Sequence, residues 1–296
     1  MLTSKRLRKI GLLLFVYLPG FVHVYAQDTL NTKQYRLDLT VLDLPYQYYA
    51  AKTVNQKANL PGFIKGYANP SMNASLSLSG SMYTSAHYGL KELFKTSSKK
   101  GFINKAKKIA YPVAVFYSDQ LLMYLPGGDG WLHEEFHRAV MTRRYVNSFN
   151  GMNRVPLGAE EVSVSHISDE NLIRFKKEDP AGFVRMQEAG IEGEYLLIDQ
   201  LQRNNFFSGQ KLLHEIHYLF STVNSIFYVR ESSNPETVDV ETDKMNQKEI
   251  TIRQRDFTGF DFSGWVYDLF RPKESYEQRG VHPTGSGITG TEKPPI

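Results

Sequence analysis

The sequence contains no cysteine among its 296 residues. Disulfide bonds, thiol nucleophiles and cysteine ligands are therefore excluded, and a metal site would have to use histidine and carboxylate side chains. A lipid-modified cysteine anchor is excluded for the same reason. The stability of the chain must come from a packed core or from a bound metal ion.

The sequence also lacks a strong charge imbalance. The formal net charge is +4, and four basic residues within positions 5–9 contribute to it. The rest of the chain is nearly neutral, which gives no support for nucleic-acid binding. A second basic group is interpreted as a solvated loop and helix face. It comprises Lys99, Lys100, Lys105, Lys107 and Lys108.

Long hydrophobic runs are missing after the N-terminal region. No stretch there reaches the 18 uninterrupted apolar residues expected of a membrane-spanning helix. The nearest candidate, 212–229, is interrupted by polar residues such as His214 and His217. The 18 tyrosines and 18 phenylalanines leave peripheral association with a membrane open.

Residues 1–26 have the pattern of a secretory signal peptide. The basic positions precede an apolar stretch from Ile10 to Phe21, and Val24-Tyr25-Ala26 satisfies the small-residue rule for cleavage. We therefore expect export, with a mature chain that begins at Gln27. Its location would be the periplasm, the cell envelope or the medium.

Composition and periodicity predict the organisation of the mature chain. With 41% hydrophobic and 22% charged residues, it is long enough for a globular domain, expected over residues 27–279. Residues 280–296 are rich in Gly, Pro, Ser and Thr and are expected to be a disordered tail.

Hydrophobic patterns predict an α+β fold that is mainly helical, with a few short strands. Helical patterns cover 86–96, 103–124, 130–145, 180–203 and 209–229. Alternating patterns predict strands at 35–44 and 162–164 and a β-hairpin at 238–252. The stretch 69–81 is rich in Ser, Asn and Gly and is predicted to be a loop.

The segment from Trp131 to Arg138 contains the pattern His-Glu-x-x-His. Residues four apart share one face of a helix, so His133 and His137 can present two imidazoles to one metal ion. Glu134 is rotated by about 100° from His133, which suits a base that holds a water molecule. Asp129 is the expected N-cap, and Phe136 belongs to an apolar stripe on the same side as the histidines.

Two imidazoles bind zinc poorly, and catalytic zinc sites usually have three protein ligands. Glu194 lies in the middle of an apolar stripe on the predicted helix that begins near Pro180. The stripe comprises Phe183, Met186, Gly190, Leu197 and Leu201. A carboxylate there needs a cationic partner, either a metal ion or an interior arginine. Glu192 or Glu188 would replace Glu194 if the helical phase were different.

The motif His133-Glu134-Glu135-Phe136-His137, followed by Glu194 on a later helix, resembles the gluzincin group of zinc metallopeptidases. The resemblance covers these two helices. It implies that His133, His137 and Glu194 bind zinc and that Glu134 activates the zinc-bound water as general base. The implied substrate is a peptide or protein. Tyr195, His214 and His217 are candidate donors to the oxyanion, although each also suits a core or surface position.

The sequence thus predicts an exported zinc hydrolase, with a metallopeptidase as the first interpretation. Two alternatives stay open: a non-catalytic cell-envelope protein with a structural metal site or no metal, and a hydrolase of lipids or other amides.

Overall fold

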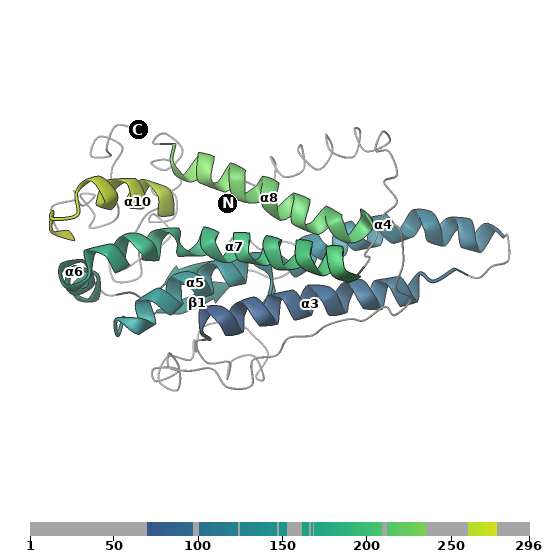
Figure 1. Ribbon diagram of the computed structural model, residues 1–296, viewed down its shortest axis with the longest axis horizontal. Coiled ribbons are helices and arrows are strands. Elements are labelled where there is room, and N and C mark those ends of the chain that lie inside the picture. Colours follow the sequence, from purple (N-terminus) through teal and green to yellow (C-terminus); the bar gives the residue numbers. More distant parts are fainter. Residues whose placement is uncertain are drawn as a thin grey trace.

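The computed structural model describes residues 70–96, 101–123, 125–146, 148–152, 162–165, 167, 169–208, 212–234 and 260–276. They form α3 (Met72–Leu93), α4 (Phe102–Leu122), α5 (Asp129–Arg143), β1 (Phe149–Met152), β2 (Val162–Ser165), α6 (Asp169–Glu178), α7 (Pro180–Ser208), α8 (Leu212–Ser232) and α10 (Asp261–Phe270). Long helices lie side by side, with α6 and α10 at one end and the α3–α4 hairpin projecting at the other (Figure 1).

The fold is mainly helical, and the α+β class expected from the sequence is wrong. In the described part of the chain, β structure is limited to β1 and β2, an antiparallel pair with Phe149 opposite Ser165. Four residues on each strand are too few to build a sheet layer. The alternating pattern at 162–164 does lie in a strand, β2, but this short pair does not change the helical class of the fold. The predicted strand at 35–44 and hairpin at 238–252 lie outside the described residues.

The loop predicted at 69–81 is also wrong, because most of this stretch is the first half of α3. Ser71 caps the helix by accepting a hydrogen bond from the Ala74 backbone N–H at 3.1 Å. Small residues such as Ser75 and Ser79 are buried. A Cβ on Gly80 would come within 2.5 Å of the Gln200 side chain, so small residues allow close contact with α7. Packing has overridden the weak helix propensity of serine and glycine.

The helix α5 lies at the centre of the fold and is buried on nearly all sides. It begins at Asp129, and Gly128 is the N-cap, so the predicted cap role of Asp129 is wrong. A Cβ on Gly128 would approach the Leu122 carbonyl oxygen to 2.0 Å, which only glycine avoids. The side chain of Asp129 is thereby released for contacts with α8.

Glycines on α7 allow it to pack tightly against α5. A Cβ on Gly190 would lie 2.3 Å from His133 Nε2, and one on Gly193 would lie 2.9 Å from the Phe136 ring. The apolar stripe predicted around Glu194 faces the core, with Phe183 and Leu197 fully buried. The helix that carries His133 and His137 therefore packs directly against the helix that carries Glu194. None of the helices in the described ranges is long and apolar enough to span a membrane.

Candidate metal centre

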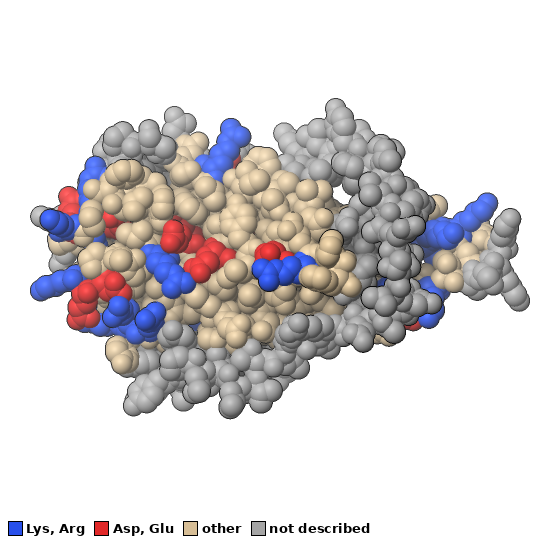
Figure 2. All heavy atoms as spheres, in the orientation of Figure 1, with Lys and Arg blue, Asp and Glu red and all other residues tan. Residues whose placement is uncertain are grey.

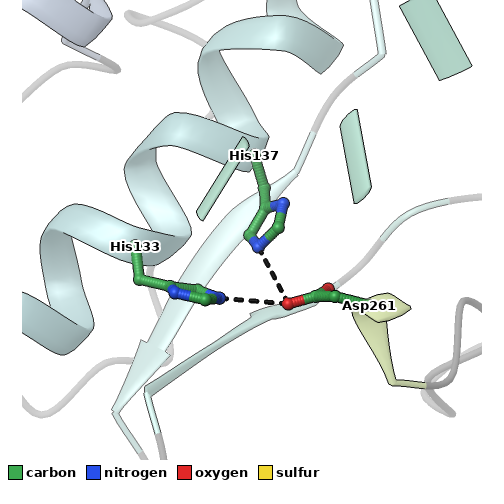
Figure 3. Close-up of side chains that lie close together, drawn as sticks. All are labelled: His133, His137 and Asp261. Carbon is green, nitrogen blue, oxygen red and sulfur yellow. Dashed lines mark hydrogen bonds and ion pairs between the residues drawn. The ribbon is translucent and has the colours of Figure 1, made fainter. Parts of the chain in front are cut away.

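Three side chains from two distant parts of the chain converge at the buried side of α5 (Figure 3). His133 Nε2 lies 3.0 Å and His137 Nε2 3.3 Å from the same oxygen, Oδ2 of Asp261. The three facing atoms all lie within 4.8 Å of one another. The histidines are 5% exposed and the Asp261 side chain 19%, so the cluster is largely closed to solvent.

The other ring nitrogen of each histidine is held by a different group. His133 Nδ1 lies 2.8 Å from Oε1 of Glu194, and His137 Nδ1 lies 2.5 Å from the backbone carbonyl oxygen of Met186. With Nδ1 as the hydrogen-bond donor, Nε2 keeps its lone pair for another partner. Among the described residues, His137 Nε2 makes no hydrogen bond, although it lies 3.3 Å from Asp261 Oδ2. Metal-binding histidines are oriented in this way by a carboxylate or a backbone carbonyl.

The electrostatics of the cluster favour positive charge. Burial opposes protonation of His133, but hydrogen bonds with Asp261 and Glu194 outweigh it and raise its pKa well above 6.5. Burial also opposes protonation of His137, yet the Asp261 charge raises its pKa. For Asp261, burial opposes ionisation, but the charges of the two histidines hold its pKa well below its usual value. A divalent cation would supply the same positive charge at the same place.

Glu134 lies beside the cluster, as the motif predicts. Its Oε2 accepts a hydrogen bond from the Val164 backbone N–H at 3.1 Å, so the strand β2 fixes this carboxylate. Its negative charge contributes to the raised pKa values of both His133 and His137. The general-base candidate is thus oriented by a strand whose contact with Glu134 could not be predicted from the sequence.

Glu194 is buried and contacts His133, although on the Nδ1 side of the ring. Its second oxygen, Oε2, accepts a hydrogen bond from the hydroxyl of Ser225 on α8. The alternatives are placed elsewhere: Glu192 pairs with Arg185, and Glu188 accepts a hydrogen bond from the Trp265 indole. The predicted helical phase was therefore correct, while the carboxylate that faces both Nε2 atoms is Asp261.

Asp261 is the functional candidate that sequence reasoning missed. It begins α10, a helix not predicted, and it lies more than 100 residues after the motif. Seven residues later on α10, Asp268 is buried and accepts hydrogen bonds from Lys176 Nζ at 2.6 Å and from Gln187. The spacing of two carboxylates two turns apart in an apolar segment was the available signal. One anchors the helix, and the other faces the histidines.

A tyrosine hydroxyl also reaches the cluster. Tyr228 on α8 donates a hydrogen bond to Asp261 Oδ2, and its ring lies edge-on to His133 with centroids 5.0 Å apart. Two of the donors proposed from the sequence lie elsewhere, since Tyr195 is 47% exposed and His217 belongs to another cluster. The side chain of the third, His214, is outside the described residues.

That other cluster is a buried network at the start of α5. The His217 ring lies between two carboxylates, with Nδ1 3.7 Å from Asp119 Oδ2 and Nε2 3.4 Å from Asp129 Oδ1. His87 Nε2 lies 2.7 Å from Asp119 Oδ1, and Ser221 donates to Asp129. The two carboxylates approach opposite edges of one imidazole. They therefore do not converge with it on a single point.

Comparison of the chain with protein-family models, with curated proteins and with solved structures finds no match, so the geometry described above is the basis for interpreting the site.

Proposed function

We propose that this protein is an exported metal-dependent hydrolase, with a zinc peptidase as the first candidate. The observation that carries the proposal is the convergence of His133 Nε2, His137 Nε2 and Asp261 Oδ2 beside Glu134. Export rests on the signal-peptide pattern of residues 1–26. A peptide or protein substrate rests on the resemblance of the motif to gluzincins.

The residues fit a metal ion in number, chemistry and spacing. Two imidazoles and one carboxylate are a donor set of catalytic zinc sites, which leave one position for water. Ligands about 2.0–2.1 Å from a tetrahedral zinc lie about 3.3 Å apart, close to the 3.0 and 3.3 Å between the histidine nitrogens and Asp261. The same donor set also suits Fe(II), so the identity of the metal has to be measured.

When bound, zinc would polarise the substrate carbonyl and lower the pKa of a bound water to near 7. Glu134 would accept a proton from the attacking water and return it to the leaving group, as base and then as acid. Its hydrogen bond from Val164 keeps the carboxylate oriented during both transfers. Tyr228 donates to Asp261 and restrains its position.

Glu194 has an orienting role in this proposal. By accepting the Nδ1 proton of His133, it fixes the ring so that Nε2 faces Asp261. The Met186 carbonyl does the same for His137. The metal ligands proposed are therefore His133, His137 and Asp261, with Glu194 behind His133.

The test of catalysis is the variant Glu134→Gln. It should retain the metal of the parent protein and lose hydrolysis of a peptide library, because the amide cannot accept a proton. The matched control is Glu192→Gln, which removes an exposed carboxylate of the same chemistry and should leave turnover unchanged. Unchanged peptide hydrolysis by Glu134→Gln would refute the assignment of the base.

The test of the metal centre is elemental analysis of the purified protein for zinc and iron. About one zinc per chain supports the proposal, and about one iron would redirect it to oxidative chemistry. Less than about 0.1 metal per chain, even after incubation with zinc, would favour packing without a metal. A zinc-containing protein without activity on peptides, esters or other amides would favour a structural metal site.

A further inference from the structure

The helix α4 differs from most surface helices, because it buries a carboxylate residue and exposes several large apolar side chains. On the side that faces α3 and α8, Val115 and the carboxylate residue Asp119 are 0% and 2% exposed. On the outward side, Phe102 is 84% and Ile109 72% exposed. A solvent-facing helix normally has the reverse pattern, with charged residues outside.

The exposed apolar residues of α4 form one continuous stripe. At 100° per residue they fall within an arc of roughly 120°, on the side of the helix opposite Val115. The stripe comprises Phe102, Ile103, Ile109, Tyr117 and Leu121, exposed by 84%, 71%, 72%, 66% and 43%. An apolar stripe of this length on the outside of a protein marks an interaction surface.

Lysines flank the stripe on both sides. Lys105, which is exposed, lies about 40° beyond Ile109 around the helix. Lys107 lies the same angle beyond Ile103 on the other side, and its ammonium group donates hydrogen bonds to the carbonyl oxygens of Leu93 and Lys95 at 3.3 Å. Lys108 lies on the Val115 side of the helix, and the helix has no acidic residue before the buried Asp119. Basic side chains are visible at this projecting end of the molecule in Figure 2.

We propose that this surface of α4 binds an anionic lipid bilayer. An apolar stripe bordered by lysines is the pattern of helices that lie in the bilayer interface, where the apolar residues enter the acyl region and the ammonium groups meet lipid phosphates. The absence of acidic side chains on the exposed part of α4 favours an anionic surface over a neutral one. The helix projects from the bundle at the end away from α10, so a membrane there leaves the metal centre clear (Figure 1).

The direct test is flotation of the protein with lipid vesicles. Vesicles of phosphatidylcholine with about 30% phosphatidylglycerol should carry the protein, while pure phosphatidylcholine and high salt should release it. The full chain and the chain from Gln27 are both measured, because the apolar residues 10–21 could bind lipid by themselves. All variants are compared within the same form of the chain.

Two variants separate the apolar and electrostatic parts of the interaction. Phe102→Ser combined with Ile103→Ser should abolish flotation. Lys105→Gln should weaken it by about fivefold, because one lysine near an anionic surface contributes about that factor. The matched controls lie elsewhere: Phe270→Ser, at a residue 72% exposed on α10, and the exposed Lys177→Gln combined with Lys273→Gln. Both controls should bind as the parent does.

A fluorescence measurement keeps the test informative if the serine variant folds poorly. Tryptophan at position 102 (Phe102→Trp) should shift its emission to shorter wavelength on adding anionic vesicles, and Phe270→Trp should not. The proposal is overturned if the parent chain ignores anionic vesicles, or if the α4 and control variants behave alike. A dimer that dissociates when the stripe is substituted would also overturn it, because a second copy would then occupy this face.

Discussion

Two buried clusters of histidine and aspartate share the helix α5, and they differ in how their atoms are directed. At the candidate metal centre, His133 and His137 direct their Nε2 atoms to one carboxylate oxygen. At the start of the helix, the single ring of His217 separates two carboxylates. The first arrangement can hold an ion at one point, whereas the second is satisfied by one proton on the imidazole. Convergence of lone pairs, rather than residue composition, distinguishes a metal site from a buried ion pair.

The largest predicted effect comes from substituting one aspartate in each cluster. Asp261→Asn should lower zinc affinity by at least about 100-fold, beyond the 10–100-fold typical of groups behind the ligands. Asp129→Asn should keep about one zinc per chain and lower the thermal midpoint, because it leaves His217 without one partner. Zinc titration and thermal unfolding of both variants measure the two effects. Equal zinc affinities would show that the two clusters do not differ as described.

The next effect concerns the space that α7 leaves for His133. A methyl group at position 190 would lie 2.3 Å from Nε2, so Gly190→Ala should displace the ring, cost about 1–3 kcal/mol of stability and reduce zinc binding. Gly89→Ala on α3 is the matched control, because no atom lies within 4 Å of its new Cβ. The Gly89→Ala variant should gain up to about 1 kcal/mol in free energy of unfolding, because alanine has a higher helix propensity than glycine. Denaturant unfolding compares the two, and a stabilised Gly190→Ala would contradict the packing.

A smaller effect is expected behind the ligands. Glu194→Gln keeps the shape of the side chain but removes the charge that His133 Nδ1 faces, so zinc affinity should fall by about 10–100-fold. Ser225→Ala should have a weaker effect in the same direction, because Ser225 acts on His133 only through Glu194. Competition with a zinc chelator provides the measurement. If Glu194→Gln lowered zinc affinity as much as Asp261→Asn does, Glu194 would instead be a direct ligand.

The smallest effect is a pH dependence specific to the second cluster. Burial opposes protonation of His217, but Asp129 and Asp119 raise its pKa above 6.5. Burial also opposes ionisation of Asp129, while His217 lowers its pKa below 3.8. The paired state therefore stabilises the fold fully between about pH 4 and 6.5, and this contribution declines as the pH rises through the raised pKa of His217.

Comparison of the parent with His217→Gln isolates that contribution. Tyr83 and His87 also face this network, and they are retained in both proteins. The difference in unfolding free energy should be largest between about pH 4 and 6.5 and should decrease above that range. A difference that grows with pH would contradict the assignment of a protonated His217.

Sequence reasoning located the parts of the site that local patterns encode. The spacing of His133 and His137 and the helical phase of Glu194 follow from a repeat of 3.6 residues, and burial of all three agrees with it. Asp261 could not be found in this way, because its place beside the histidines depends on how α10 docks through Lys176 and Asp268. Likewise, the helix over Ser75 and Ser79 depends on tertiary contacts that serine propensity does not contain.

The distance in sequence between the histidines and Asp261 has a consequence for biosynthesis. During synthesis, a chain that has not yet emerged beyond α8 contains both histidines but lacks the carboxylate that faces them. Under the proposed function, a complete metal centre can form only after α10 has emerged and docked. Zinc capture would thus be one of the last events of maturation, and a truncated chain could not become an active hydrolase.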